Sequence, residues 1–570
     1  MWNTLINKYP NNQDSLQAQF EKHKNNFSPD IESYDILSID KNDLVSNLLL
    51  TYNTYQKCNW KNEISLDTYC QYLLPYKSGR EPFVTNCRSY LLNQFLKEKK
   101  DSIFNTDLVH AATEVHKWLY SRKIKYRILG NDEQSSIPEL SADILDKLNF
   151  GTCHQITTEG VSYMRALGIP AAIDFAPTYL NINAGHEWGT VILDSAHCLP
   201  FDITSKKINN IKKEFFIFSK VYRRTYLPVK ESHFMQRGIC TALPEMFNNP
   251  FLQDVTKLYT KTKNFEIPVP KNVSSKFCYI CVFNRRSLSW DPVGWGKVEN
   301  GKAYFKDVGV NGVYLPVMEE SGKLVIFDSP FILNKEGKTK FLKSNTAVET
   351  VKLFRKVNSN VFKDIQKSRM VDGIFQGSNY ADFRTRVDLY TIKKNPGDYF
   401  NTINIERNTN NQFRYVRYYS SKDSYGNVAE VEFYQKNSTT PVKGKIIGTD
   451  GSYLDDPKCT KRAVFDGNLL SYFDSKIADN SWAGLDLGSK KEISKIRFIA
   501  RNDMNCIQIG NIYELFYWNE GWKSLGKKKA SSTFLQYNYV PKNSLLWLRN
   551  LTEGNEERIF TYQNDRQVWW

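Results

Sequence analysis

One helix between residues 153 and 167 constrains the fold more than any other part of the sequence, because its start and its end are both marked. It is predicted from apolar residues at a mostly helical spacing, namely Ile156, Val161, Tyr163, Met164 and Leu167. Gly168 and Pro170 stop the helix, as a glycine just past a helix end and a following proline do. Cys153 therefore lies in the first turn, where unpaired N–H groups and the positive end of the helix dipole favour a thiolate. We predict that Cys153 is a nucleophile.

A strand pair that follows the helix brings a histidine and an aspartate together. Three strands are predicted, at residues 171–179, 186–193 and 196–202. For a turn centred near residue 194, opposed residues have numbers that add up to about 388–389, which makes His186 and Asp202 neighbours. Opposed side chains share a face with Cβ atoms roughly 5 Å apart, so the carboxylate can hold one imidazole nitrogen. The other nitrogen would face Cys153.

These three residues would supply what acyl transfer from a thiol requires. Cys153 is the nucleophile, His186 takes its proton and later protonates the leaving amine, and Asp202 orients the imidazole. The backbone N–H of Cys153 is expected to stabilise the oxyanion, and the second donor is left open between Gln155 and Trp188. This chemistry needs no cofactor.

Other polar residues near these motifs are expected to have supporting roles. His154 is expected at the surface or behind the triad, and Glu159 on the solvent side of the helix. Glu187 and Trp188 are expected to shape the cleft, and His197 to point away along the hairpin.

Four motifs in order resemble the transglutaminase core, which reads roughly G-x-C, R-A-L-G-I-P-A, H-x-W and a closing D. They are Gly151-Thr152-Cys153, Arg165 to Ala171, Gly185 to Trp188 and Pro200-Phe201-Asp202. The resemblance implies a papain/transglutaminase-like catalytic domain and maps the triad of that family onto Cys153, His186 and Asp202. The superfamily also includes peptide N-glycanases and many bacterial cysteine proteases. Pro200-Phe201 departs from the Trp-x-x-V/P-D pattern of many members, so Asp202 rests chiefly on the strand register.

The remaining chain is expected to form several further domains. Its 570 residues exceed the roughly 100–200 residues of a typical domain. Apolar spacing is helical in residues 43–50 and 108–120, whereas short Tyr- and Phe-rich runs dominate the second half. The predicted fold class is therefore multidomain α+β. The expected parts are a helical N-terminal region packing on the core (1–130), the catalytic domain (131–265), a β-rich domain (266–346), a possible discoidin-like β-sandwich (347–440) and a last β-sandwich (441–570).

The last part resembles the discoidin or coagulation factor 5/8 type C family, a galactose-binding-like β-sandwich. The matching motifs are Asp466-Gly467-Asn468, Trp482 to Gly488, Ile493 to Phe498 and Tyr513 to Tyr517. The resemblance implies loops that bind glycans and often a Ca²⁺ ion, for which Asp466 and Asn468 offer oxygen ligands in a tight turn. Trp482 and Asp486 are expected in the core and in a turn. Residues 414–434 resemble the closing strands of a second such sandwich.

The charge and the exposed aromatic residues bear on partners. A formal charge of +16 favours an acidic partner, and nucleic acid, anionic glycans and membrane surfaces all qualify. The basic residues are spread along the chain without a nucleic-acid-binding pattern, which argues against nucleic acid. Trp522, Trp569 and Trp570 either stack on sugar rings or close a sandwich or an interface. The expected partners are a protein or glycoprotein substrate and a glycan, and an acidic glycan would suit the charge.

The cysteines and the absence of long apolar runs bear on compartment. Ten cysteines are too sparse for a disulfide framework, and Cys278 and Cys281 would point to opposite faces of a strand, which argues against a metal or redox pair. No apolar run reaches the roughly 18 residues that span a bilayer, and the first residues lack the order of a signal peptide. By analogy with secreted multidomain enzymes, we expect an exported protein whose signal peptide is missing from this sequence, with a cytoplasmic location left open.

The function expected from these features is that of a thiol enzyme acting on amide bonds. It would be a peptidase, an amidase or a peptide N-glycanase-like enzyme on a protein or glycoprotein, and its β-sandwiches would hold it near the substrate. Hydrolysis is favoured over cross-linking because no amine-donor site is identified. The alternative is a non-catalytic glycan- or surface-binding protein with a vestigial core, against which the intact triad argues.

Overall fold

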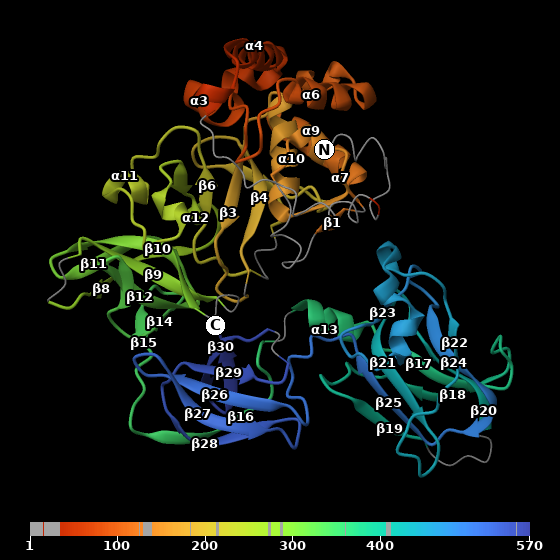
Figure 1. The fold of residues 1–570 in the computed structure, drawn as a ribbon. Coiled ribbons are helices and arrows are strands. Elements are labelled where there is room, and N and C mark those ends of the chain that lie inside the picture. The colour runs from red at the N-terminus through yellow and green to blue at the C-terminus, as the bar shows by residue number, and fades with distance from the viewer. Residues whose placement is uncertain are drawn as a thin grey trace. The chain divides into compact units, whose positions relative to one another are not determined.

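The chain is a multidomain α+β protein, as predicted, with two compact units (Figure 1). The units are residues 1–341 and 342–570. The computed structural model describes residues 15, 35–124, 126–128, 139–182, 184–211, 216–271, 275–284, 289–358, 361–405, 412–553 and 556–570. Apart from Ser15, the first 34 residues of the expected helical region lie outside the described residues.

The first unit begins with helices, and the predicted segments 43–50 and 108–120 fall within α4 and α7. The α-helices are α3 (Asp35–Ser38), α4 (Lys41–Lys57), α5 (Leu66–Thr68), α6 (Cys87–Glu98), α7 (Leu108–Arg122), α9 (Ala142–Leu145), α10 (Cys153–Ala166), α11 (His233–Arg237) and α12 (Thr256–Tyr259). Short 3₁₀ or π turns are η2 (Asn59–Glu63), η3 (Tyr69–Leu73), η4 (Asp101–Asn105) and η5 (Glu245–Asn248). No helix of the described residues is both long and apolar enough to cross a membrane.

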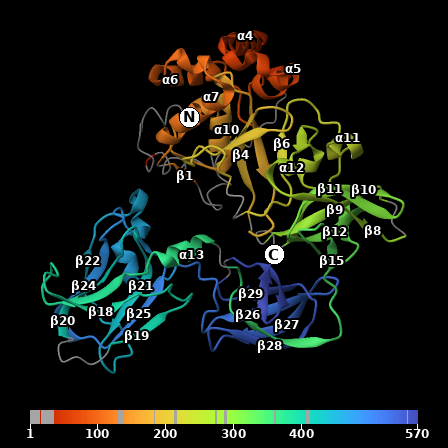
Figure 2. The same cartoon turned by 180° about the vertical axis from the view of Figure 1, so that it is seen from behind.

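Two sheets and a short parallel pair complete the first unit (Figure 2). The central sheet has the order β5–β4–β3–β6–β7, with strands β3 (Ala171–Ala176), β4 (His186–Ile192), β5 (Cys198–Phe201), β6 (Tyr222–Arg224) and β7 (Leu252–Asp254). The second sheet has the order β15–β14–β12–β9–β10–β11–β8, and β13 pairs with β12. Its strands are β8 (Thr262–Pro268), β9 (Phe277–Asn284), β10 (Ser289–Glu299), β11 (Lys302–Gly309), β12 (Gly312–Glu320), β13 (Lys323–Ile326), β14 (Phe331–Leu333) and β15 (Thr339–Phe341). The parallel pair is β1 (Arg127–Ile128) with β2 (Phe150–Gly151).

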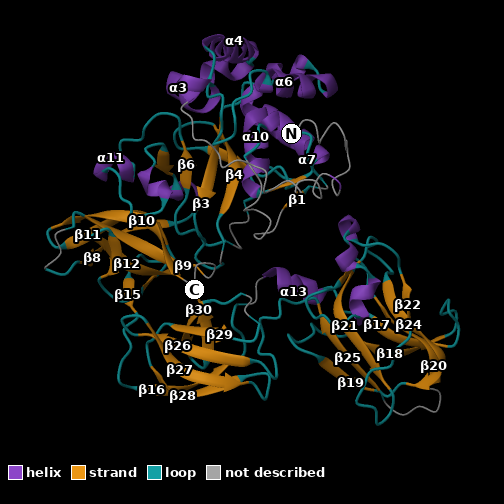
Figure 3. Cartoon of the chain, viewed as in Figure 1, coloured by secondary structure: helices purple, strands orange, loops and turns teal. Residues whose placement is uncertain are grey.

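Helix α10 lies between the N-terminal helices and the central sheet (Figure 3). One buried cluster joins them. It includes Ile156, Val161 and Met164 of α10, Leu91 and Phe95 of α6, Val115 of α7, and Ile173 and Val191 of the sheet. Apolar burial on this scale holds α10 against the sheet that contains β3 and β4.

A buried polar network ties the strands of the central sheet together. Arg223 of β6 donates two hydrogen bonds of 2.8 Å to Asp174 of β3, and the Asp174 side chain is 0% exposed. Thr190 of β4 and Tyr259 of α12 both donate to the same carboxylate, and the indole of Trp188 donates to Tyr259. A buried ion pair is tolerated when its hydrogen bonds are satisfied in this way.

The contact between Gly189 and Phe201 positions the strand that leads to Asp202. These two residues lie opposite each other on β4 and β5, and a Cβ built on Gly189 would overlap the Phe201 ring. The same ring approaches Gly160 of α10. Phe201 therefore occupies space that two glycines leave open.

The second unit contains a β-sandwich in which two sheets share one core. The sheets are β18–β17–β20–β24–β22 and β19–β25–β21–β23, and the core includes Val416, Phe433 and Phe498. Helix α13 (Val361–Ser368) and the turns η6 (Tyr453–Asp455), η7 (Pro457–Cys459) and η8 (Lys461–Phe465) accompany them. The strands are β17 (Ile374–Ser378), β18 (Arg386–Thr391), β19 (Asn401–Asn404), β20 (Gln412–Tyr419), β21 (Gly426–Tyr434), β22 (Lys445–Gly448), β23 (Phe473–Asp474), β24 (Trp482–Glu492) and β25 (Lys495–Ala500).

The rest of the second unit is built from two distant pieces of chain. Strand β16 (Val348–Leu353) pairs with β28 (Leu535–Pro541), and both share a core with the sheet β27–β26–β29–β30–β31. The other strands are β26 (Ile512–Trp518), β27 (Trp522–Lys529), β29 (Leu546–Asn550), β30 (Ile559–Gln563) and β31 (Arg566–Trp569).

Strand pairing crosses residue 440, where the sequence placed a domain boundary. Strand β20 pairs with β24 and β21 pairs with β25, so strands on both sides of residue 440 share sheets. The discoidin-like motifs also divide, because residues 482–498 belong to the sandwich and residues 513–517 belong to β26. The polar stretch near residue 440 is therefore a loop within one sandwich and not a domain boundary. The spacing of residues along the sequence does not show which distant strands pair. Near residue 265, β8 runs across the expected boundary.

Replacing Gly189 by Ala is expected to destabilise the first unit, because the new methyl group would displace the Phe201 ring. Overpacking of this kind typically costs about 1–3 kcal/mol of unfolding free energy. Thermal or denaturant unfolding measures the loss. Gly397→Ala is the matched control, because a Cβ there meets only Asn401 Oδ1, at 3.5 Å. Equal midpoints for the two variants would contradict the packing argument.

Candidate active site

The predicted nucleophile stands at a helix start with two free backbone donors. Helix α10 begins at Cys153, and Thr152 caps it: the Thr152 hydroxyl accepts from Gln155 N at 3.1 Å, and Gln155 Oε1 accepts from Thr152 N at 3.0 Å. Ile156 N donates to Thr152 O at 3.2 Å. Within the described part of the chain, the backbone N–H groups of Cys153 and His154 donate to no acceptor. Their positive ends lie beside the partly exposed Cys153 thiol.

His186 contacts both of its predicted partners. It is the first residue of β4, its Nε2 lies 3.6 Å from Asp202 Oδ2, and its ring lies near enough to Cys153 for the sulfur to favour the imidazolium. That distance is an ion-pair contact slightly longer than an ordinary hydrogen bond. Nδ1 is therefore the nitrogen left for Cys153. Burial alone would lower the pKa of His186, but the contacts with Asp202 and Cys153 prevail and raise it to about 9.

Asp202 is held as a carboxylate by a turn of its own. Burial would raise its pKa, yet the contacts with His186 and Thr204 lower it. Thr204 donates to Asp202 Oδ1 through N, at 2.9 Å, and through Oγ1, at 2.6 Å, and Ser205 N donates to Asp202 O. The unshared oxygen, Oδ2, is the one that faces His186.

The register that brings Asp202 to His186 differs from the predicted one. Gly189 lies opposite Phe201 and Ile192 opposite Cys198, which is two residues away from a pairing of His186 with Asp202. The cause is a longer turn, because Leu193 N and Asp194 N both donate to His197 O. A displacement of two residues preserves the face of each side chain, whereas a displacement of one would reverse it. His186 and Asp202 therefore remain close on one face.

His116 supports the Asp202 turn and was missed by the sequence analysis. Its side chain is buried in α7, its Nε2 lies 2.9 Å from Ser205 O, and burial lowers its pKa. A carbonyl oxygen only accepts, so the Nε2 of this neutral imidazole carries the proton. The signal available in the sequence was its place on the apolar stripe of the helix, between Ala112 and Leu119.

Both candidates for the second oxyanion donor are engaged elsewhere. The Gln155 side chain is 3% exposed and its oxygen belongs to the helix cap. The Trp188 indole is 1% exposed and donates to Tyr259 Oη at 3.2 Å, while its ring lies 6.0 Å from the His186 ring. These contacts give the two residues a structural role beneath the triad.

A second contact between α10 and β4 lies next to the contact of Cys153 with His186. It joins His154 and Glu187, which follow Cys153 and His186 in the sequence, and their Nδ1 and Oε2 atoms are 2.6 Å apart. Arg224 donates to Glu187 Oε1 at 2.9 Å. Burial would lower the pKa of His154, but Glu139 and Glu187 raise it to about 10, so the imidazole is charged at neutral pH. This clamp holds the start of α10 to β4. His154 was expected at the surface or behind the triad, and the structure places it in this clamp. Glu187 was expected to shape the cleft, and it lines the cavity described next.

The cavity beside the clamp measures about 610 Å³. It is lined by Ser78, Gly79, Arg80, Glu139, His154, Phe175, Glu187, Arg224, Thr225, Tyr226, Glu245, Met246, Asn249, Phe251 and Leu252. Its walls therefore combine aromatic and apolar side chains with charges of both signs, including an ion pair between Arg80 and Glu245. Adjacent residues on a strand point to opposite faces, so Glu187 faces this cavity while His186 faces Cys153.

The position expected for Glu159 is wrong. Its side chain is 0% exposed and lies 3.0 Å from the buried Lys123 Nζ. Burial raises its pKa to about 7, and Lys123 opposes that rise. Lys123 also donates to the carbonyl oxygens of Leu145, Asp146 and Leu148. The helical spacing of α10 does not reveal this partner, because Lys123 comes from the end of α7.

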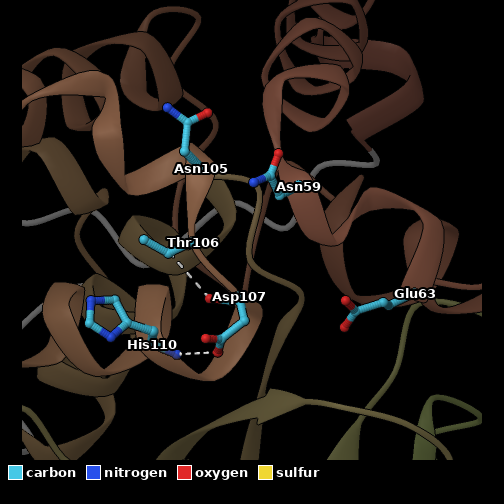
Figure 4. A pocket seen from close by; sticks show the side chains of 6 residues that line it. All are labelled: Asn59, Glu63, Asn105, Thr106, Asp107 and His110. Carbon is cyan, nitrogen blue, oxygen red and sulfur yellow. Dashed lines mark hydrogen bonds between the residues drawn. The ribbon is translucent and has the colours of Figure 1, made fainter.

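A separate open hollow of about 500 Å³ lies between η2 and the start of α7 (Figure 4). It is lined by Asn59, Glu63, Asn105, Thr106, Asp107 and His110. The Asp107 carboxylate accepts from His110 N at 2.8 Å, so it serves as the cap of α7. None of the triad residues lines this hollow.

The suggested calcium ligands make hydrogen bonds within their own turn. Asp466 accepts from Asn468 N at 2.8 Å and from the Ser471 hydroxyl, and Asn468 Oδ1 accepts from Leu470 N. Over the described ranges, no group of three or more His, Cys, Asp or Glu residues is arranged to hold a metal ion. Calcium binding at this turn stays a prediction.

The remaining residues singled out in the sequence lie in the β-rich parts of the chain. Trp482 is half-buried outside the sandwich core, at 5.1 Å from the Arg417 guanidinium, and Asp486 is paired with Arg414 at 2.9 Å. The expectation of Trp482 in the core is therefore wrong. Trp522 and Trp569 pack against Trp547 and Phe560, at 5.3 and 5.0 Å. Trp570 N donates to Ile559 O, and Cys278 and Cys281 are buried in β9.

Comparisons with known proteins identify no family for this chain. No protein-family model and no curated protein matches it. A solved structure from Cytophaga hutchinsonii, provisionally described as a cysteine protease, matches over 31% of this chain and 47% of that chain, with 15% sequence identity and a TM-score of 0.17. The match spans about half of that chain, and a likeness of this size carries no argument about fold or function.

The pKa of His186 yields a prediction with a definite sign. A histidine whose pKa rises from 6.5 to about 9 on folding stabilises the folded state fully below pH 6.5, and this stabilisation is lost as the pH rises through about 9. NMR of the labelled imidazoles should show one ring titrating near pH 9 that disappears in His186→Gln. In Asp202→Asn its pKa should fall toward 6.5. An unchanged pKa in Asp202→Asn would show that Asp202 does not hold the imidazolium.

Removing the charge of the clamp should loosen the start of α10. Glu187→Gln is expected to lower the unfolding free energy by about 1.5–3 kcal/mol, the range for hydrogen bonds to charged groups. It should also slow alkylation of Cys153. The control is Asp194→Asn, which removes a similar contact to His197 with side chains 73% and 56% exposed. That variant should keep the wild-type midpoint, and an equal loss in both variants would contradict the clamp.

Proposed function

We propose that the chain is a thiol enzyme of transglutaminase-like type that cleaves or transfers acyl groups at amide bonds. The observation that carries this proposal is the contact of His186 with both Cys153 and Asp202 at the capped start of α10. Support also comes from the four transglutaminase-like motifs, which supply all three residues.

In the proposed reaction, each residue moves charge in a defined order. The Cys153 thiolate attacks the carbonyl carbon of an amide, and the carbonyl electron pair moves to oxygen, where the free N–H of Cys153 can stabilise it. When the pair returns, the C–N bond breaks, and the leaving nitrogen takes the proton of the His186 imidazolium. His186 then takes a proton from water, which hydrolyses the thioester and restores the thiolate. Asp202 stabilises the imidazolium throughout.

We propose water as the usual acceptor, which makes the enzyme a peptidase or amidase on a protein or glycoprotein. Release of glycans from Asn, as in peptide N-glycanases, is a variant of the same chemistry. The cavity beside the His154–Glu187 clamp could accept a substrate segment with both polar and apolar groups. No catalytic cofactor is part of this proposal.

A second candidate function is glycan binding through the β-sandwich. The observation that favours it lies on β20 and β24, where the half-buried rings of Trp482 and Tyr419 lie 5.1 and 4.5 Å from the Arg417 guanidinium. Aromatic rings beside a cation suit a sugar that carries a carboxylate. In this proposal the sandwich holds an exported enzyme near a glycosylated substrate, and Ca²⁺ at Asp466 and Asn468 would be structural.

Cys153→Ala should abolish turnover of peptide and glycopeptide substrates while leaving glycan binding unchanged. A substrate screen with wild type and variant, read by mass spectrometry, measures the first, and a glycan array measures the second. Cys70→Ala, at another partly exposed cysteine, is the control and should keep full activity. Loss of glycan binding without any turnover in the wild type would favour the non-catalytic protein.

A further inference from the structure

Tyr179 carries a buried hydroxyl for which the described residues supply no hydrogen-bond partner. Its side chain is 2% exposed. Leaving a buried donor unpaired is unfavourable, so such groups in native proteins call for an explanation. A ligand atom bound in the active site would supply the missing acceptor.

The backbone and the ring of Tyr179 are both fixed at the end of the sheet that carries His186. Ala176 of β3 lies opposite His186, and three residues farther on Tyr179 N donates to Ala184 O at 2.9 Å. The Tyr179 ring stacks on Phe216 with centroids 4.8 Å apart and packs on Phe218 at 5.3 Å. Trp188, which lies beside His186, packs on the same Phe218 ring at 5.8 Å. The hydroxyl is therefore held without help from a hydrogen bond of its own.

The surroundings of Tyr179 keep its hydroxyl protonated. Burial raises its pKa above the usual value, and negative charge on Cys153 and Asp202 raises it further. A phenol in this setting stays a donor over the whole working range of pH. It is a group suited to meet negative charge that develops on a neighbouring oxygen.

We propose that the Tyr179 hydroxyl is the second oxyanion donor, opposite the backbone N–H of Cys153. The proposal rests on the proposed thiol-enzyme function. It replaces both sequence candidates, because Gln155 is held in the helix cap and Trp188 donates to Tyr259. As Cys153 Sγ bonds to the carbonyl carbon, the carbonyl electron pair moves to oxygen. Tyr179 keeps its proton and donates a hydrogen bond to that oxygen until the pair returns.

The test compares two reactions of Cys153 that differ only in the need for an oxyanion donor. Acetylation by p-nitrophenyl acetate forms a tetrahedral oxyanion, whereas alkylation by iodoacetamide displaces iodide directly. Tyr179→Phe should slow acetylation by at least tenfold, and about 10²–10³-fold is typical for loss of one such donor. Alkylation should change less than twofold. Release of p-nitrophenolate and the mass of the modified protein report the two rates.

The controls separate failure of this proposal from failure of the proposed function. Tyr314→Phe, at a buried tyrosine whose hydroxyl donates to Gly309 O, should leave both rates unchanged. Wild-type acetylation rates in Tyr179→Phe, or an equal fall in acetylation and alkylation, would overturn the donor role while the thiol enzyme stands. If wild type is acetylated no faster than Cys153→Ala, the proposed function fails, and the donor role fails with it.

Discussion

The buried pair of Asp174 and Arg223 is the interaction on which the rest of the catalytic region depends. Arg223 makes a bidentate contact with a carboxylate that is fully removed from water, and Thr190 and Tyr259 satisfy its remaining acceptor sites. Charged hydrogen bonds are strong in a medium of low dielectric, but an incomplete network there is costly. This completeness fixes β3, β4 and β6 in one order. Through Tyr259 it also fixes Trp188, two residues from His186 on the same face.

The candidate site is assembled where the first turn of α10 meets the first residues of β4. Two neighbouring residues from each element make two parallel contacts: Cys153 with His186, and His154 with Glu187. Alternation along the strand sends His186 and Glu187 to opposite faces, so one contact provides the chemistry and the other holds the elements together. In the clamp, the charged His154 imidazole lies between the carboxylates of Glu187 and Glu139. The Cys153 thiol remains partly exposed and can meet a substrate. Rigid support of this kind is what a nucleophile and its base require.

Packing decides how Asp202 reaches this site. Phe201 fits against Gly189 and Gly160, and His116 holds the turn that follows through Ser205 O. The Asp202 carboxylate is then directed by Thr204 on one oxygen and left to His186 on the other. Gly189, Gly160 and the buried neutral His116 therefore position Asp202. The Thr152 cap positions Cys153 in the same sense.

The sequence by itself determined the local elements of the site and left their long-range contacts open. Helix α10 and its start at Cys153 followed from apolar spacing and from the stop at Gly168 and Pro170, which are all local signals. The strand carrying His186 was equally readable, but its register was not, because the length of the turn after Leu193 depends on hydrogen bonds to His197. Glu159 was misplaced and His116 missed because their partners, Lys123 and Ser205, come from distant segments. The sandwich was divided wrongly at residue 440 for the same reason, since β20 and β24 lie far apart in the chain. Periodicity reports which side of an element is buried, and only the tertiary structure decides what it is buried against.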